Sequence, residues 1–180
     1  MALAREGARL GIDYVQVREK DLADRALLRL VTEVVLATTG TATRVLVNGR
    51  ADVASLAGAH GVQLPEAALP VEPVRRAFGH LLLGVSCHSI EAAHKAAAGG
   101  ANFVLLGPIH PTPGKEGPFL GLDVLAEASR RLAIPVHAIG GIDAEHVRAV
   151  RAAGARGMAA IRPFLARPLG PVVEELRRAT

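Results

Sequence analysis

One loop of the sequence gathers three side chains that could do chemistry. His110, Thr112 and Lys115 bring an imidazole, a hydroxyl and an amine to Gly107–Lys115, a segment with three prolines and two glycines. Proline and tight-turn residues restrict the backbone of such a loop, so its side chains are held in place. An imidazole moves protons near neutral pH, and a fixed cation stabilises developing negative charge. We therefore expect His110 and Lys115 to be catalytic, with a solvated connection as the alternative.

A second group of polar side chains stands at the end of an apolar run near the N-terminus. In Val15–Lys20, strand alternation places Gln16, Arg18 and Lys20 on one face. Three polar groups on one face form a poor core but a good site for an anion or a polar ring. The other interpretation is a strand end that frays into solvent.

Glycines mark a third candidate site near the C-terminus. Gly140 and Gly141 follow an apolar run and precede a predicted helix, so the backbone could approach a ligand closely. The next apolar run ends at Ile161 and Arg162. In a barrel of eight strands, the loops after the last two strands commonly bind phosphate. We expect Gly140, Gly141, Ile161 and Arg162 to bind a phosphate group.

Alternating strands and helices must position these residues. Helices between apolar strands imply parallel pairing, and the spacing predicts an α/β fold, a (β/α)8 TIM barrel, as one domain over 1–180. The chain opens inside a helix, so the first strand of the barrel is expected to be missing from it. The predicted strands are Tyr14–Arg18, Arg44–Val47, Gly61–Leu64, Leu82–Cys87, Phe103–Leu106, Pro135–Ile139 and Gly157–Ile161. The predicted helices are Ala2–Leu10, Asp24–Ala37, Ala51–Ala57, Val71–Ala77, Ile90–Ala98, Leu122–Arg131, Ala144–Ala152 and Pro168–Arg178.

Composition narrows the class of partner. The formal net charge is +4, but the arginines are scattered and aromatic residues make up 3% of the chain, which disfavours nucleic acid. The apolar runs are too short to span a membrane, and the single cysteine, Cys87, fits a cytoplasmic protein and a packing role. We expect no nucleic-acid or membrane partner. An unpaired sheet edge favours a homo-oligomer, although the sequence leaves the oligomeric state open.

Several motifs in order identify a resemblance. The segments VQVREKD, VLVNGRADVA, GAHGVQL, GVSCHSIEAAHKAAAGGANFVLLGPIHPTPGK and IPVHAIGGI are similar to the thiamine phosphate synthase/TenI superfamily of (β/α)8 barrels, from Ala4 to Phe164. The family has an additional N-terminal strand. The resemblance implies a small phosphorylated thiazole ligand and adds Asn48, Ser86 and His88 to Gln16, Arg18, Lys20 and Thr112 as substrate-binding residues. His88 could instead shape the end of its strand.

The synthase branch of this family joins a hydroxymethylpyrimidine diphosphate to a thiazole phosphate and releases diphosphate with Mg²⁺ present. It holds the metal with two aspartates, because the leaving group is strongly anionic. In this sequence Gly49 stands at the first aspartate position and Ala68 at the second. Glu66 is a carboxylate of the same loop, but one displaced carboxylate is a poor substitute for a pair. The resemblance therefore implies no metal and no cofactor, with Mg²⁺ required only for synthase activity.

The TenI branch aromatises a carboxythiazole phosphate by moving a proton, which needs no metal. Its histidine directly follows the glycine at the strand end, where this chain has Pro108; His110 lies two residues further on and is expected to take that role. We therefore predict a TenI-like thiazole tautomerase, an isomerase of thiamine biosynthesis. The alternatives are a thiamine phosphate synthase with an altered metal site and a non-catalytic regulatory protein that binds a phosphorylated ligand.

The remaining histidines are interpreted by their positions. His137 lies within a predicted strand and is either a hydrogen-bonded core residue or a functional one. Four histidines on or beside helices are expected to be solvated: His60, His80, His94 and His146.

Overall fold

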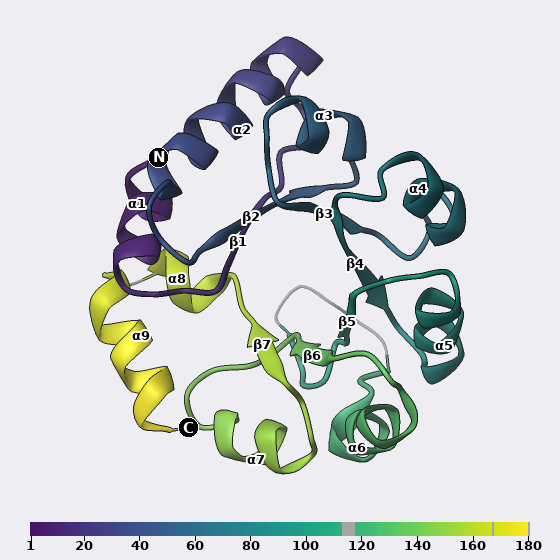
Figure 1. Ribbon diagram of the computed structural model, residues 1–180. Coiled ribbons are helices and arrows are strands. Elements are labelled where there is room, and N and C mark those ends of the chain that lie inside the picture. Colours follow the sequence, from purple (N-terminus) through teal and green to yellow (C-terminus); the bar gives the residue numbers. More distant parts are fainter. Residues whose placement is uncertain (113–117, 167, 180) are drawn as a thin grey trace. The chain divides into compact units, whose positions relative to one another are not determined.

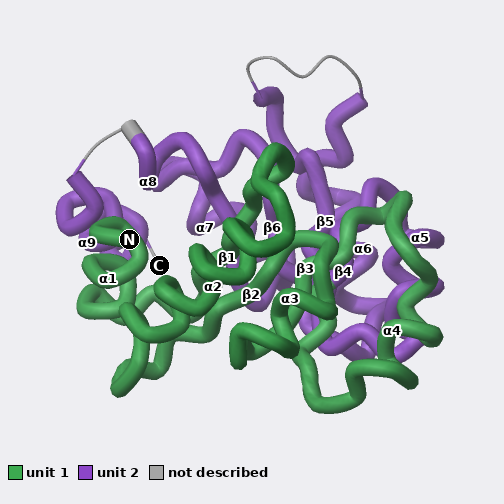
Figure 2. Tube along the Cα trace, turned by 90° about the horizontal axis from the view of Figure 1, so that it is seen from above, with its two compact units in different colours: residues 1–84 green, residues 85–180 purple. Residues whose placement is uncertain are grey.

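The fold is described here from a computed structural model that covers residues 1–112, 118–166 and 168–179 (Figure 1). Strands and helices alternate along the described chain. The chain divides into two compact units, Met1–Gly84 and Val85–Thr180, called unit 1 and unit 2 below (Figure 2). No helix within the described ranges is both long and apolar enough to cross a membrane. That the chain forms one domain stays a prediction.

Unit 1 contains three complete parallel strands and the start of a fourth. In the ladders, Val15 pairs with Val45 and Val47 with Val62. Val45, Val47 and Val62 are fully buried, as expected for strands covered by helices on one face and packed side chains on the other. The elements of unit 1 are α1 (Ala2–Arg9), β1 (Tyr14–Val17), α2 (Asp24–Thr38), β2 (Arg44–Asn48), α3 (Ala51–Leu56), β3 (Gly61–Leu64), α4 (Val71–Ala77) and the first half of β4 (Leu82–Cys87).

Unit 2 continues the same alternation. All four residues of β5 (Phe103–Leu106) are buried, and Leu106 pairs with Ala138 of β6 (Val136–Ile139). Ile139 in turn pairs with Ala159 of β7 (Gly157–Ala159) in a second parallel ladder. The helices of unit 2 are α5 (Ile90–Ala98), α6 (Gly121–Arg131), α7 (Val147–Ala152), α8 (Arg162–Ala166) and α9 (Leu169–Arg178).

The predicted strands all form, and they pair in parallel, in chain order within each unit. The fold class is therefore the predicted one, a (β/α) barrel fold, with seven strands among the described residues. Two helix predictions need correction. Residues 144–146 form a turn, so α7 begins at Val147 and not at Ala144. Arg162–Ala166, for which the sequence predicted no helix, is helical.

Candidate functional site

The candidate site of unit 2 is formed by the loops that follow β5 and β6. Beyond the ends of these strands, the backbones stay hydrogen-bonded. The N–H of Ile109 donates to the carbonyl of Ile139 at 2.9 Å, and that of His110 donates to the carbonyl of Gly140 at 3.0 Å. The β5–β6 pairing thus extends into the loops and fixes the position of His110 relative to the segment after β6.

Two glycines after β6 allow this close approach. Gly141 has φ +64°, and a Cβ there would lie 2.7 Å from the Cβ of His110 and 2.5 Å from the carbonyl oxygen of Pro111. Gly140, with φ +96°, would place a Cβ 2.6 Å from the Cβ of Pro108. The packing of the two loops therefore explains both glycines, before any ligand is considered.

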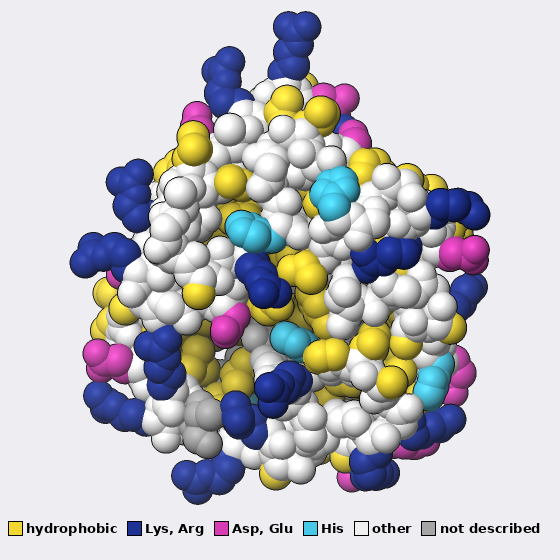
Figure 3. All heavy atoms as spheres, in the orientation of Figure 1, with side chains coloured by type: hydrophobic (Ala, Val, Ile, Leu, Met, Phe, Trp, Pro, Cys, Tyr) yellow, Lys and Arg dark blue, Asp and Glu magenta, His cyan; other side chains and the backbone are white. Residues whose placement is uncertain are grey.

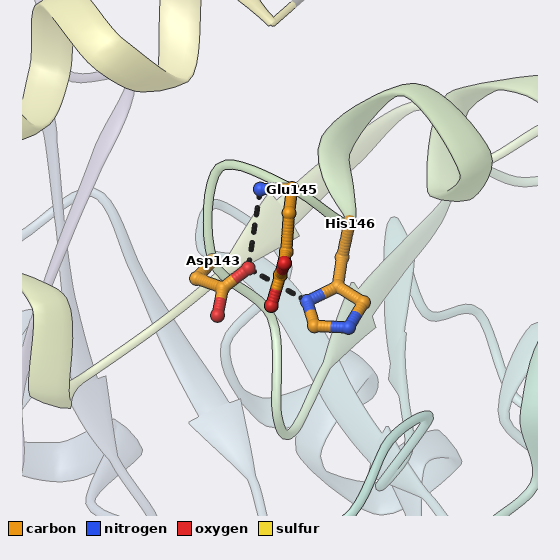
Figure 4. Close-up of side chains that lie close together, drawn as sticks. All are labelled: Asp143, Glu145 and His146. Atoms are coloured by element: carbon orange, nitrogen blue, oxygen red, sulfur yellow. Dashed lines mark hydrogen bonds and ion pairs between the residues drawn. The ribbon is translucent and has the colours of Figure 1, made fainter.

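Two imidazoles meet where the loops run together. The ring centroids of His110 and His146 are 4.1 Å apart, and the ring planes are inclined by 33°. The Nδ1 atom of His146 lies 2.7 Å from the Oδ1 atom of Asp143 (Figure 4). The carboxylate fixes the orientation of the His146 ring and favours the tautomer with a proton on Nδ1. We call Asp143, His146 and His110 the imidazole cluster.

Burial sets the protonation of His110. Its Nε2 atom is buried and has no hydrogen-bond partner among the described residues. Burial lowers the pKa of His110 below its ordinary value, the positive charge of His146 lowers it further, and Asp143 acts in the opposite direction. His110 is therefore neutral over a wider pH range than an exposed histidine.

The prediction that His146 is solvated holds only in part. Its side chain is 28% exposed and contacts both Asp143 and His110. The Oδ1 atom of Asp143 also accepts a hydrogen bond from the backbone N–H of Glu145 at 3.2 Å, which closes a turn before α7. This turn replaces the helical start that the sequence predicted. His94 is likewise solvated only in part, because its Nε2 atom is buried.

The other predicted residues of unit 2 are less closely associated. The hydroxyl of Thr112 donates to the carbonyl of His110, two residues earlier, at 3.2 Å. Ser86 is half-buried in β4, and His88 is exposed just after it. Ile161 and Arg162 are exposed at the start of α8. Lys115, the second predicted catalytic residue, lies outside the described residues.

The predicted residues of unit 1 lie at the carboxyl ends of its first two strands. Gln16 is the exposed third residue of β1, and Arg18 and Lys20 are exposed beyond its end. Asn48 is the half-buried last residue of β2. Basic side chains are spread over the face in Figure 3 with acidic ones among them.

The segment where the resemblance places Mg²⁺ lacks the ligands for it. A cavity of about 290 Å³ in unit 1 is lined by Gly49 and Ala68, neither of which has a side-chain oxygen. Arg50 occupies the neighbouring carboxylates, with nitrogen–oxygen distances of 2.7 Å to Asp24 and of 2.7 and 2.9 Å to Asp52. Its guanidinium also holds the pKa of Asp52 below the ordinary value. The described residues around this cavity do not fit a Mg²⁺ site.

One further group of possible metal-ligand atoms is explained by hydrogen bonds within a turn. Among the described residues, side chains of Asp143, Glu145 and His146 place ligand-type atoms within 4.8 Å of one another. The hydrogen bonds of the turn already use the Oδ1 atom of Asp143 and the Nδ1 atom of His146. We assign no metal to this group.

Two other residues, His137 and Cys87, pack within the fold. His137 is half-buried in β6, and the centroid of its ring lies 5.1 Å from that of Phe103. Cys87 is 1% exposed, which confirms its predicted packing role.

Parallel strands, intervening helices and polar loops at the carboxyl ends of the strands define an α/β-barrel protein. The chain belongs to the TMP-TENI family, described as thiamine monophosphate synthase, whose model matches residues 1–164. This finding confirms the superfamily that the sequence motifs indicated. It does not separate the two branches.

Individual relatives agree with the family. The thiamine-phosphate synthase of Methanoculleus marisnigri is 43% identical over 162 residues, which cover 88% of this chain and 77% of the relative. That of Anaeromyxobacter dehalogenans is 44% identical over 168 residues, covering 92% and 75%. A solved structure, thiamine phosphate pyrophosphorylase from Pyrococcus furiosus, matches with a TM-score of 0.91 and 30% identity over 99% of this chain and 87% of that one.

These relatives overturn the predicted activity. The missing aspartates led to a thiazole tautomerase, an isomerase, but the similar proteins are named as synthases and a pyrophosphorylase. The inference failed because it took the loss of two metal ligands as loss of the whole reaction. Relatives above 40% identity outweigh two positions, and the synthase alternative is favoured.

Proposed function

We propose that this chain is a thiamine phosphate synthase, a transferase that joins a hydroxymethylpyrimidine diphosphate to a thiazole phosphate with release of diphosphate. The observation that carries the proposal is the identity of 43% to a thiamine-phosphate synthase over 88% of this chain. The similarity of 0.91 in TM-score to a thiamine phosphate pyrophosphorylase supports it.

We assign the predicted ligand-binding residues to this reaction as part of the proposal. Gly140, Gly141, Ile161 and Arg162 would bind the phosphate of the thiazole, because loops after the last strands of such barrels commonly do so. Lys115 would stabilise the negative charge that develops on the leaving group. The predicted substrate-binding residues Gln16, Arg18, Lys20, Asn48, Ser86, His88 and Thr112 would contact the two rings. His110 keeps a place in the site but loses the tautomerase role.

The experiment is a coupling assay with both substrates, in which thiamine phosphate and diphosphate are measured together. We expect equal amounts of the two products. Each substrate incubated alone is the control, since diphosphate released without the thiazole phosphate would indicate hydrolysis. Tight binding of both substrates without any product would refute the proposal in favour of a binding protein.

The role of Mg²⁺ is a separate part of this assay. The residues at 49 and 68 have no ligands for it, so we expect coupling to persist in EDTA. A full dependence on added Mg²⁺ would mean that the chain holds the ion by other residues.

A further inference from the structure

In the proposed reaction, no group is yet assigned to neutralise the leaving oxygen directly. A departing diphosphate gains negative charge as its bond to carbon breaks; Lys115 is proposed to stabilise that charge electrostatically, and a metal ion or a proton donor is required to neutralise it on the oxygen itself. In unit 1 the side chains beside Gly49 and Ala68 are unsuited to a metal, since Arg50 occupies Asp24 and Asp52. A proton donor could meet the same requirement.

Unit 2 contains an oriented proton donor. His146 uses its Nδ1 atom in the 2.7 Å contact with Asp143. Figure 4 shows its other ring nitrogen, Nε2, on the side of the ring away from Asp143. Among the described residues, none hydrogen-bonds to this nitrogen, so it can reach a ligand. A histidine held by a carboxylate on one nitrogen and open on the other is a common arrangement for proton transfer.

The surroundings of the two imidazoles distinguish them as proton donors. With centroids 4.1 Å apart, His110 and His146 repel each other when both are charged. Of the two rings, His146 is hydrogen-bonded to a carboxylate, whereas the Nε2 atom of His110 is buried without a described partner. His146 is therefore the ring oriented to donate a proton, and His110 packs against it.

The location suits a substrate contact. His146 precedes α7 in the loop after β6, and His110 lies in the loop after β5. In barrel enzymes the catalytic residues stand in loops at the carboxyl ends of the strands. The side chain of His146 is 28% exposed, so the ring is supported on one side and accessible on another.

We propose that His146 is the general acid of the coupling reaction and that Asp143 positions it, an inference that rests on the proposed synthase function. The bond between the pyrimidine methylene carbon and the diphosphate oxygen breaks, and its electron pair goes to that oxygen. The proton on Nε2 of His146 is transferred to the same oxygen. The thiazole nitrogen supplies the electron pair of the new carbon–nitrogen bond, and water reprotonates His146 after release of diphosphate.

The kinetic test uses His146→Gln and Asp143→Asn, assayed in EDTA. We expect His146→Gln to lower kcat by about 10²–10⁴-fold, the usual contribution of a general acid, with little change in KM. His80→Gln is the matched control, because His80 is an exposed histidine of unit 1 whose contact is with the hydroxyl of Ser55 at 3.1 Å. A kcat of His146→Gln within twofold of the wild type would overturn the proposal.

The split between kcat and KM separates positioning from a purely structural effect of Asp143. Among the described residues, the charged or titratable groups near His146 are Asp143, Glu145 and His110. Asp143→Asn removes the carboxylate that orients the His146 ring, so kcat should fall while KM changes little. An unchanged kcat in this variant would refute the role of Asp143.

A binding measurement keeps this inference distinct from the proposed function. Inorganic diphosphate in EDTA is titrated into histidine-labelled wild-type protein and followed by NMR. We expect the ring signals of His146 to shift and those of His80 to stay in place. If the wild type shows no coupling either in EDTA or with added Mg²⁺ but His146 responds, the synthase proposal fails alone. If His146 does not respond at millimolar diphosphate, the general-acid proposal fails, whatever the coupling assay gives.

Discussion

Replacement of Gly141 by alanine tests the close approach of the two loops that form the imidazole cluster. An alanine at φ +64° adopts the left-handed region, which costs about 1–2 kcal/mol. Its Cβ would also lie 2.7 Å from the Cβ and the carbonyl oxygen of His110 and 2.5 Å from the carbonyl oxygen of Pro111. Carbon contacts are normally about 3.5–4.0 Å, so the loop must shift, at a further cost of about 1–3 kcal/mol. We expect a total destabilisation of about 2–5 kcal/mol from these two costs together.

Gly121 provides the matched control in the same unit. Its φ is +73°, and a Cβ there would meet nothing within 4 Å. Gly121→Ala therefore carries only the backbone cost of about 1–2 kcal/mol. Both variants are unfolded in urea and by heat, with circular dichroism as the signal. The difference of about 1–3 kcal/mol corresponds to a gap of about 2–12 °C in Tm for a chain of this size.

Equal loss of stability in the two variants would refute this reasoning. It would mean that the contacts of Gly141 with His110 relax without cost and that the loops are not held together as described.

Three other predictions concern the cluster, the ion pairs and the core. The pKa of His110 is lowered from 6.5, so the unfolded chain binds a proton there that the folded chain does not, and stability should decline as the pH falls below 6.5. His110→Phe should flatten that part of the profile of unfolding free energy against pH; identical slopes would contradict it. Arg50→Gln should let the pKa of Asp52 rise towards 3.8 in an NMR titration, and it should cost only about 0.2–1 kcal/mol for each exposed ion pair. Replacement of Leu125, which is fully buried in α6, by alanine should lower the free energy of unfolding by about 2–5 kcal/mol. The same replacement of exposed Leu165 should change it by less than about 0.5 kcal/mol, and both are measured by unfolding in urea.

Much of the fold could be predicted because burial leaves a local pattern in the sequence. Phe103–Leu106 is a run of four apolar residues, and all four are buried in β5. The predicted helix over Ile90–Ala98 has the same bounds as α5, where Ser89 caps the first turn by accepting from the N–H of Ala92. In such segments the type of each residue, apolar or polar, is enough to predict whether it is buried.

The candidate site was harder to predict because its contacts join residues far apart in the sequence. His110 was recognised from its own loop, but its partner His146 is brought to it by the backbone bonds between the loops after β5 and β6. One local signal was available: Asp143 and His146 are three residues apart, and aspartate commonly closes a turn over the next residues. That spacing predicts the pair, although not its contact with His110.

The predicted activity failed for a different reason. Gly49 and Ala68 show only that two metal ligands are absent. Their absence does not identify the group that stabilises the charge in their place. Similarity along the chain to synthases carried more information than those two positions.

The β5–β6 hydrogen bonds continue past the strand ends, so the backbone at position 110 is held independently of the side chain that does the chemistry there. The N–H of His110 donates to the carbonyl of Gly140, and that of Ile109 donates to the carbonyl of Ile139, so the main chain holds this loop whatever side chain stands at 110. Glycines at 140 and 141 are constrained by the close packing of that main chain. Position 110 can therefore change residue type by mutation with little loss of fold, and new reactivity can arise there one substitution at a time.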